Sequence, residues 1–278
     1  MMKIETRHKE PLKEYTTLHI GGYCHNLYFP KSEKEIRYLL DTYDPIILGK
    51  GSNVLINDTV EYDHVMILTK YKGIYLQGDV IIAESGARLM DVCLFALEHS
   101  LTGLEFAYGI PGSVGGAVIM NAGAYGGEVK DVLIQVDTTE GSYSNEDCCF
   151  EYRKSRFSDT KECILRGYFK VQKGNKEEIQ AKMQDLITRR REKQPLDKYS
   201  AGSTFKRGKD FYASATISEC GLKGYAVNDA MVSTKHAGFL INEGNASYTE
   251  FLALIHDVKR IVFEKTGRVL ETEVKIIE

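Results

Sequence analysis

Hydrophobic positions in the N-terminal third of the chain switch between the spacing of helices and that of strands. Ser32-Glu-Lys-Glu35 has the form of a capping box, and the apolar residues after it share one helical face, which predicts a helix through Ile36, Leu39, Leu40 and Tyr43. Short apolar runs predict buried strands at 45–48, 65–68 and 80–83, and the pattern at 89–101 predicts a second helix. This mixture of elements predicts an α+β fold.

Two further amphipathic segments predict long helices in the C-terminal part. The first spans 177–191, ends in three consecutive arginines and stops before Pro195, and its inward positions are Ile179, Met183, Leu186 and Ile187. The second begins at the capping box Ser247-Tyr-Thr-Glu250 and ends at Gly267.

Strand periodicity follows at 269–277. It places Leu270, Thr272, Val274 and Ile276 on one face and Glu271, Glu273 and Lys275 on the other. Taken by itself, the pattern favours a solvated edge strand, with Glu273 as an ordinary exposed carboxylate.

Composition and charge exclude several classes of protein. With 278 residues, 43% of them hydrophobic, the chain is long enough for two or three compact units. Its net charge of −3 lacks the basic excess of nucleic-acid-binding proteins. No apolar run approaches the about 20 residues that span a bilayer, and the N-terminus has no apolar signal region. We therefore expect a cytoplasmic protein.

The six cysteines show neither a C-x-x-C pair nor metal-ligand spacing, so we expect free thiols and no metal site. Cys148 and Cys149 are predicted on a strand, where neighbouring side chains point to opposite faces and a disulfide between them would be strained. Of the seven histidines, only His236 lies in a candidate functional segment, and we expect it to have a structural role.

The strongest chemical signal is the segment 103–127, in which glycine recurs among small and apolar residues. Glycine inside regular structure costs roughly 0.5–1 kcal/mol, so this density indicates backbone held close to a ligand or in left-handed conformations. Backbone N–H groups in such turns form anion sites, and a pyrophosphate is a typical occupant. The spacing of Gly109, Gly112, Gly115 and Gly116 matches neither G-x-G-x-x-G nor the P-loop motif.

Two more glycine elements lie upstream. The predicted strand at 45–48 runs into Gly49-Lys-Gly51-Ser52-Asn53, and Thr16-Thr-Leu-His-Ile-Gly21-Gly22 lies earlier still. Each of the three elements alone is typical of an ordinary glycine turn. Together they favour one shared ligand.

These elements also carry a family resemblance. TTLHIGG, GKGSNVLI, GLEFAYGIPGSVGGAVIMNAGAYGGEV, YRKSRF, SAGSTFKR, STKHAGFLINEGNAS and ETEVKII resemble, in order and spacing, the UDP-N-acetylenolpyruvoylglucosamine reductase family over nearly the whole chain. The central glycine segment also resembles FAD domains of the vanillyl-alcohol-oxidase type. The short spacing between YRKSRF and SAGS is similar to that of the shorter, second-type branch of the family.

The resemblance implies a two-part FAD-binding domain at 1–196, with subdomains at about 1–70 and 71–196. A smaller α+β substrate-binding domain at 197–278 follows, and its final strand, about 268–278, folds back on the first subdomain. The cofactor implied is noncovalent FAD. The residues assigned to it are Gly49, Gly51, Ser52, Asn53, Gly109, Pro111, Gly112, Ser113, Gly115, Gly116, Asn121, Ala122, Gly123 and Ala124.

The implied substrate is UDP-N-acetylglucosamine enolpyruvate, whose double bond is conjugated to a carboxylate. Hydride addition at its terminal carbon pushes negative charge into that carboxylate, so preorganised partners are needed in the transition state. The resemblance assigns this role to Arg153 and Glu273, and the proton donation that follows to Ser203. Without the resemblance, Arg153 is typical of a surface arginine and Ser203 of a turn serine.

NADPH is implied as the hydride donor, and it uses largely the same cleft as the substrate. Lys206, Arg207 and Lys235 are the candidate phosphate-binding cations, although lysines and arginines are usually just solvated. Many relatives carry arginine where this chain has Lys275, so a bidentate role there is in doubt.

Two other classes remain open. One is an FAD-dependent oxidase of a small alcohol or sugar, which could hold flavin covalently through His19, Cys24 or His25. The other is a non-catalytic module that binds a UDP-sugar or flavin. The presence of Arg153, Ser203 and Glu273 argues against both. The sequence does not determine the oligomeric state.

Overall fold

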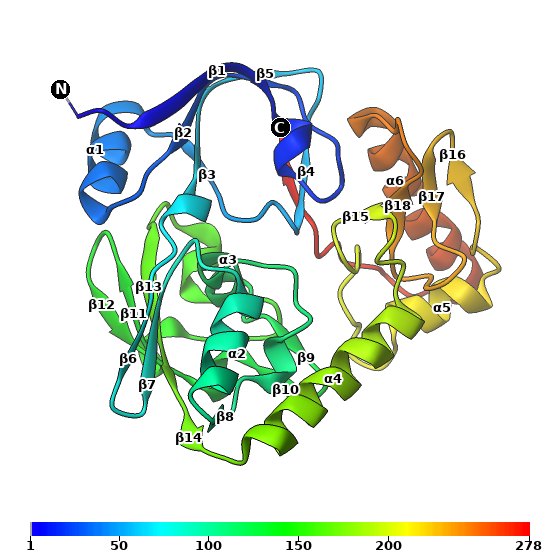
Figure 1. Ribbon diagram of the computed structural model, residues 1–278. Helices are drawn as coiled ribbons and strands as arrows, with labels where there is room; N and C mark the ends of the chain where they lie inside the picture. Colours follow the sequence, from blue (N-terminus) through cyan, green and yellow to red (C-terminus); the bar gives the residue numbers. More distant parts are fainter. Residues whose placement is uncertain (1) are drawn as a thin grey trace. The chain divides into compact units, whose positions relative to one another are not determined.

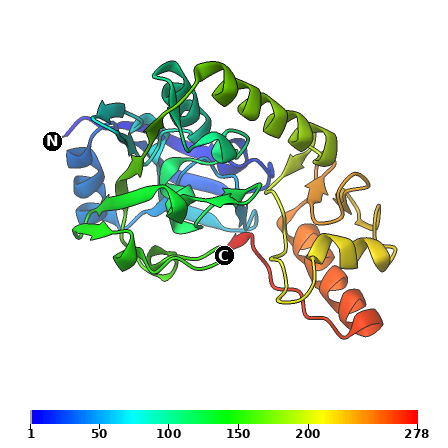
Figure 2. The same ribbon diagram turned by 90° about the horizontal axis from the view of Figure 1, so that it is seen from below.

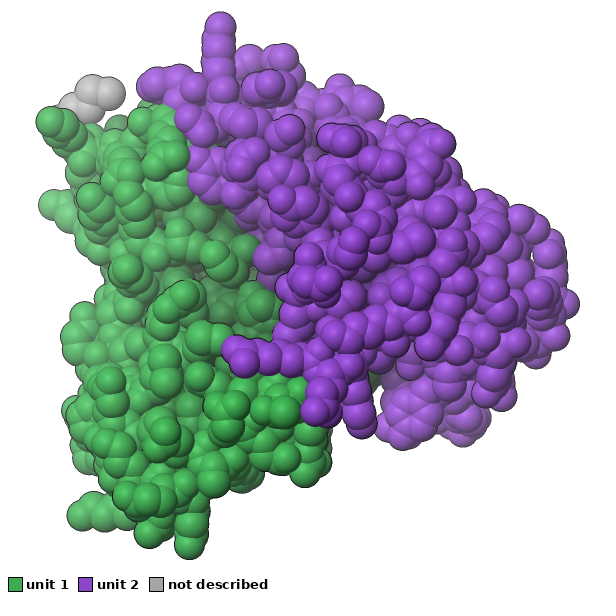
Figure 3. Space-filling view, turned by 45° about the vertical axis from the view of Figure 1, so that its right-hand side comes forward, with its two compact units in different colours: residues 1–7, 26–50, 64–190 green, residues 8–25, 51–63, 191–278 purple. Residues whose placement is uncertain are grey.

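The computed structural model describes residues 2–278, which form an α+β fold in two compact units (Figure 3). Unit 1 comprises Met1–Arg7, Asn26–Lys50 and His64–Arg190, and unit 2 comprises His8–His25, Gly51–Asp63 and Arg191–Glu278. The chain therefore passes between the units several times. These units are defined by compactness, and the division into cofactor and substrate domains at 196/197 stays a proposal.

The described part of the chain contains six α-helices (Figure 1). Their bounds are α1 Glu33–Tyr43, α2 Leu89–Glu98, α3 Val114–Ile119, α4 Lys176–Lys193, α5 Ala213–Glu219 and α6 Tyr248–Thr266. The predicted starts of two helices are confirmed, because the hydroxyls of Ser32 and Ser247 accept hydrogen bonds from the N–H groups of Glu35 and Glu250. Gly267 has a φ of 69° and ends α6 in the left-handed conformation, also as predicted.

The strands are short. In chain order they are β1 Glu5–Pro11, β2 Tyr23–Phe29, β3 Ile46–Leu48, β4 Val54–Ile56, β5 Glu61–Ile67, β6 Ile74–Gln77, β7 Val80–Glu84, β8 Leu101–Thr102, β9 Gly123–Ala124, β10 Gly127–Glu128, β11 Leu133–Thr138, β12 Ser142–Ser144, β13 Ile164–Lys170, β14 Gln172–Lys173, β15 Tyr199–Ser200, β16 Ala226–Val227, β17 Ala230–Val232, β18 Leu240–Asn242 and β19 Lys275–Ile277.

Unit 1 is built around an antiparallel sheet with the strand order β12-β11-β13-β7-β6. Helices α2 and α3 pack against its strands β7 and β13 (Figure 2). The core between them is formed by buried aliphatic and aromatic side chains, including Ile81, Val92, Val118 and Phe169. This packing fixes the glycine-rich segment that surrounds α3.

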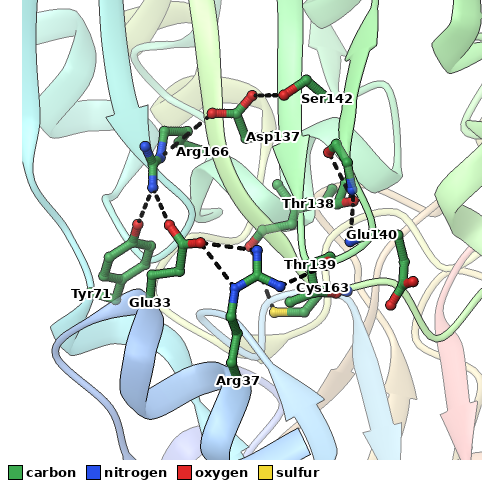
Figure 4. A network of polar contacts seen from close by, with 12 residues as sticks. Glu33, Arg37, Tyr71, Asp137, Thr138, Thr139, Glu140, Ser142, Cys163 and Arg166 are labelled. Carbon is green, nitrogen blue, oxygen red and sulfur yellow. Dashed lines mark hydrogen bonds and ion pairs between the residues drawn. The ribbon is translucent and has the colours of Figure 1, made fainter.

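A polar network joins α1 to this sheet (Figure 4). Arg166 on β13 contacts Glu33 on α1, the Tyr71 hydroxyl at 3.3 Å and Asp137 on β11 at 3.8 Å. Arg37 reaches from α1 to the Thr139 carbonyl oxygen at 2.7 Å. The network is part of unit 1 and holds α1 in place through charge-assisted hydrogen bonds.

Unit 2 contains an antiparallel sheet with the order β15-β18-β17-β16. Helix α6 packs against β16 and β17, and buries Phe251, Leu254 and Val258 in the core of the unit. At the end of the chain, β19 pairs in parallel with β4, so that Ile276 lies opposite Leu55.

Three local predictions are wrong. The strand at 269–277 is reduced to β19 and an isolated bridge between Thr272 and Phe205, because these two parts of the segment pair with different partners, β4 and Phe205. Cys148 and Cys149 lie in and after a short 3₁₀ turn rather than on a strand, and Cys149 has a φ of 47°. The helix at 89–101 ends at Glu98, and Leu101–Thr102 forms β8. All six cysteines are free thiols, as predicted.

Candidate functional site

Two of the predicted glycine elements meet in unit 1. A Cβ atom added to Gly49 would lie 2.3 Å from the Ser113 hydroxyl oxygen, so the turn after β3 directly contacts the residue that precedes α3. Gly116 lies on the same side, because a Cβ there would lie 3.6 Å from the same oxygen. The fold thus brings Gly49 next to Ser113 and Gly116, which lie much later in the sequence. The predicted cofactor residue Pro111 is exposed.

The start of α3 is held by backbone hydrogen bonds to the segment after β7. The N–H groups of Val114 and Gly115 donate to the carbonyl oxygens of Ala87 and Ser85, at 2.9 and 2.8 Å. A Cβ on Gly115 would lie 3.0 Å from the Ser85 Cβ, so a larger residue at this position would push against Ser85. The Ser85 hydroxyl is buried without a hydrogen-bond partner among the described residues. No sequence motif marks Ser85.

The third glycine element lies in unit 2. A Cβ on Gly51 would lie 2.1 Å from the Tyr15 carbonyl oxygen, and the Thr17 N–H donates to the Gly51 carbonyl oxygen at 3.0 Å. Thr17 also donates its hydroxyl to the Ser200 carbonyl oxygen at 2.7 Å. The early threonine-rich segment therefore packs on Gly51, with the half-buried Ser52 next along the chain.

Gly123, Ala124 and the residues after them form a tight hairpin of β9 and β10. Tyr125 and Gly126 at its tip both have positive φ, 55° and 87°, as a two-residue turn of type I′ requires. The hairpin borders a pocket of about 390 Å³. The pocket is lined by Gly123, Ala124, Tyr125, Gly126, Gly127, Glu128, Lys130, Asp131, Tyr152 and Arg153.

Arg153 occupies a strained turn at this pocket. It has a φ of 56°, which is uncommon for a residue other than glycine and is found where the surrounding structure imposes it. Its guanidinium lies 5.0 Å from the Tyr152 ring centroid and donates to the Gly123 carbonyl oxygen at 3.3 Å. The sequence predicts a strand before Arg153, but the structure has a turn closed by Glu151 and Lys154.

The turn that carries Arg153 is anchored to the end of α3. The Ser155 and Ser158 hydroxyls both donate to the Ile119 carbonyl oxygen, at 2.9 and 3.1 Å. Asn121, fully buried, donates to the Glu151 carbonyl oxygen at 3.0 Å and accepts from the Lys130 N–H at 3.0 Å. Its side chain is therefore engaged within the protein, and the N–H groups of Asn121 and Ala122 donate to the Val118 and Ala117 carbonyl oxygens at 3.2 and 2.8 Å.

In unit 2, the Ser203 segment lies beside the Glu273 segment. The Glu273 N–H donates to the Thr204 carbonyl oxygen at 2.8 Å, and Phe205 is bridged to Thr272. Asn53 donates its side-chain amide to the Glu273 carbonyl oxygen at 3.2 Å. Glu273 is half-buried and its backbone is hydrogen-bonded on both sides, whereas Glu271 is exposed.

The three candidate cations each have an interaction within unit 2. Lys206 lies 3.4 Å from the Glu271 carboxylate, Lys235 donates to the Arg191 carbonyl oxygen at 2.6 Å, and Arg207 lies 4.5 Å from the Tyr212 ring centroid. The nearby His236 accepts from the Gly238 N–H at 3.2 Å, and burial lowers its pKa. A neutral imidazole in this turn fits the structural role expected for it.

Comparisons with known proteins agree over most of the chain. Residues 194–277 match the C-terminal domain of UDP-N-acetylenolpyruvoylglucosamine reductase, and residues 26–142 match an FAD binding domain. The UDP-N-acetylenolpyruvoylglucosamine reductase of Geobacillus thermodenitrificans is 46% identical, over 96% of this chain and 91% of its own. The chain belongs to the UDP-N-acetylenolpyruvoylglucosamine reductase family.

Two further relatives support the assignment to this reductase family. The enzyme of Caldanaerobacter subterraneus subsp. tengcongensis is 44% identical, over 96% of this chain and 92% of its own. The crystal structure of UDP-N-acetylenolpyruvylglucosamine reductase from Thermus caldophilus superposes with a TM-score of 0.85 at 34% identity and covers both chains completely. The predicted family and fold class are thereby confirmed.

The residues of the glycine region fit the dinucleotide that such a fold binds. Gly116 is exposed, and a Cβ there would make only an ordinary contact with the Ser113 hydroxyl, so its backbone is accessible. The unpartnered Ser85 hydroxyl lies against the same segment. The sequence analysis missed Ser85, Tyr125 and Tyr152. The two tyrosines lie inside the motifs GAYGG and YRKSRF. They stand out only in the structure, by the positive φ of Tyr125 and by the exposure of both side chains.

Proposed function

We propose that this chain reduces the enolpyruvyl double bond of UDP-N-acetylglucosamine enolpyruvate and yields UDP-N-acetylmuramate, a precursor of peptidoglycan. The observation that carries the proposal is near full-length identity of 44–46% to reductases of this name. Peptidoglycan synthesis supports the wider assignment of the protein to cell-wall formation, cell shape and cell division. A location in the cytoplasm, where nucleotide-sugar precursors are made, belongs to the same proposal; residues 2–278 contain no helix able to cross a membrane.

Noncovalently bound FAD would accept a hydride from NADPH and pass it on to the double bond of the substrate. Gly49, Ser113 and Gly116, which lie together in unit 1, would hold the cofactor. Gly51, Ser52 and Asn53 stay predicted cofactor residues. Asn53 also holds the Glu273 backbone. Glycines at these positions allow the backbone to approach phosphate oxygens closely.

Arg153 and Glu273 bind and polarise the substrate carboxylate in this proposal. The guanidinium of Arg153 borders an open pocket and is oriented by Gly123 and Tyr152, which suits it to accept developing negative charge. Glu273 is half-buried on a backbone fixed by Thr204 and Asn53. The Arg153 guanidinium is therefore oriented by its contacts, and the Glu273 side chain extends from a fixed backbone.

Ser203 donates the proton to the adjacent carbon. Gly202 before it has a φ of 77°, and Thr204 after it is buried and accepts from the Leu240 N–H at 3.2 Å. The hydroxyl is therefore presented from a fixed turn, and a neutral hydroxyl is acidic enough for a carbanion-like centre. Lys206, Arg207 and Lys235 remain candidates for the phosphates of UDP.

Steady-state oxidation of NADPH tests the activity. The purified yellow protein should oxidise NADPH rapidly only when UDP-N-acetylglucosamine enolpyruvate is present. Acid precipitation should release the flavin into the supernatant. Colour retained in the pellet, or turnover with a small alcohol and oxygen instead, would favour a covalent flavin oxidase.

Rapid-mixing absorbance tests the role of Ser203. We expect Ser203→Ala to leave reduction by NADPH nearly intact and to slow reoxidation by the enolpyruvyl substrate by about 10²–10⁴-fold, the range of general acid catalysis. Ser218→Ala, an exposed serine on α5, is the control. Equal slowing of both half-reactions would assign Ser203 to the shape of the site.

A further inference from the structure

Arg190 is a cation without a partner. It lies in the last turn of α4, and its Nε is buried with no hydrogen-bond acceptor among residues 2–278. No ion pair or hydrogen bond to Arg190 is found in that part of the chain either. The preceding Arg189 behaves differently, since it is 57% exposed and pairs with Asp185 at 2.8 Å.

The stem of Arg190 packs on the glycine-rich segment. A Cβ on Gly109 would lie 2.9 Å from the Arg190 Cδ and 3.3 Å from the Ile187 Cδ1. Gly109 therefore leaves the space that the arginine stem fills. This contact places Arg190 at the start of the segment 109–116, within unit 1.

Packing of the stem does not supply the guanidinium with a hydrogen-bond acceptor from the described residues. A positive side chain near the end of a helix interacts favourably with the helix dipole, but the exposed Arg189 and Lys193 already provide that charge. A buried charge without a partner is unfavourable, and burial lowers the pKa of Arg190 while the nearby Tyr125 raises it. An anion that accepts from the guanidinium removes this cost, because the planar fork of N–H groups matches paired oxygens.

We propose that Arg190 binds an anionic group of the flavin dinucleotide and is a cofactor-positioning residue. The inference rests on the proposed function, which supplies FAD as the ligand. Two parts of FAD offer this chemistry. The pyrophosphate is anionic in both redox states, whereas the N1–C2=O edge of the ring gains negative charge on reduction.

Two measurements on Arg190→Met distinguish these sources, namely FAD binding to the flavin-depleted protein and the midpoint potential of the holoenzyme. A pyrophosphate contact should raise the Kd for oxidised FAD at least tenfold with little change in potential. A contact with the ring edge should lower the potential by about 30 mV for each tenfold loss in preference for reduced over oxidised FAD. Arg190→Lys should change the same quantity as Arg190→Met, Kd or midpoint potential, but by less. Lysine keeps the positive charge and loses the planar fork of N–H groups.

Arg189→Met is the matched control and should leave both quantities unchanged. If Arg190→Met fails to fold, Arg190→Lys gives the decision, with far-UV circular dichroism and Tm as checks of folding. A folded variant at position 190 with wild-type Kd and potential overturns the inference, even if its NADPH affinity is weaker. Wild-type protein that binds no FAD would instead contradict the proposed function itself.

Discussion

Glu273 differs from Glu271 in exposure: Glu273 is half-buried and Glu271 is exposed, although the Glu271 backbone is also held, by the Lys206 N–H at 2.8 Å. Thr204 and Asn53 contact the backbone of Glu273, whereas the Glu271 side chain is 73% exposed and lies 3.4 Å from Lys206. An isolated exposed charge contributes at most about 1 kcal/mol. The two residues therefore form a natural pair for comparison.

We expect Glu273→Gln to lower kcat by about 10²–10³ with little change in KM, the pattern of a group that acts mainly in the transition state. Glu271→Gln should stay within a few-fold of wild type. Steady-state kinetics and thermal denaturation of both variants distinguish a catalytic from a structural role of Glu273. Near-normal turnover of Glu273→Gln contradicts the catalytic role, and a parallel loss of Tm would make the residue structural.

Gly115 and Gly116 are adjacent, yet the structure uses them differently. A Cβ on Gly115 would meet the Ser85 Cβ at 3.0 Å, whereas one on Gly116 meets only the Ser113 hydroxyl at 3.6 Å, an ordinary contact. A bulky substitution at Gly115 would therefore disturb the packing of the protein as well as the binding of the ligand. Gly116 offers the cleaner test of close backbone approach.

We expect Gly116→Ala to keep the Tm of the flavin-free protein and to raise the Kd for FAD about tenfold or more, because a methyl group occupies the space of the ligand. Gly115→Ala should lower the Tm of the flavin-free protein. Differential scanning fluorimetry and FAD titration separate the two effects. An unchanged Kd in Gly116→Ala would remove that residue from the cofactor site.

At the scale of elements, the contact between α1 and the sheet of unit 1 depends on Asp137 and Arg166. Burial raises the pKa of Asp137, but hydrogen bonds from Tyr168, Ser142 and Gln135 and the charge of Arg166 outweigh it and hold the pKa below its usual value. Such a carboxylate stabilises the fold above its unfolded pKa of about 3.9. That stabilisation is lost as the pH falls through the folded pKa.

We expect wild-type protein to lose its stability advantage over Asp137→Asn as the pH is lowered from 6 to below about 3.9. Urea unfolding at a series of pH values measures this difference. Asp41→Asn serves as the control, because Asp41 is an exposed carboxylate on α1 outside the network. A difference between wild type and Asp137→Asn that stays constant with pH would show that the network does not depend on this charge.

At the scale of the whole molecule, each unit is assembled from separate stretches of the chain. Unit 2 combines residues 8–25 and 51–63 with the C-terminal part, and Leu18, Ile20 and Leu55 contribute to its core. Both units carry predicted FAD residues, for example Gly49 in unit 1 and Gly51 in unit 2. A ligand that binds only the folded chain stabilises it by mass action.

We therefore expect removal of FAD to lower the Tm, and re-addition at 100 times its Kd to restore about 2.7 kcal/mol of stability. Riboflavin, which lacks the pyrophosphate, should stabilise much less at equal concentration. Calorimetry on flavin-free and reconstituted protein measures both effects. Equal Tm values with and without FAD would contradict a resident cofactor.

Local patterns in the sequence determined the elements whose causes are themselves local. The capping residues Ser32 and Ser247, the terminating Gly267 and the apolar face of α6 each act within a few residues, so their positions follow from the sequence. The motif order also determined the family, because it samples the whole chain. The residue-level roles of Arg153, Ser203 and Glu273 stay predictions.

Only the tertiary structure decided what depends on contacts between distant residues. The strand predicted at 269–277 is shortened because the chain pairs first with Phe205 and then with β4. The left-handed turn of Arg153 is imposed by anchors at Ile119 and Asn121. In the sequence Arg190 is one of three consecutive arginines, and only the structure shows that its Nε is buried without a partner among the described residues. No local pattern in the sequence predicts such contacts, because they join residues far apart in the chain.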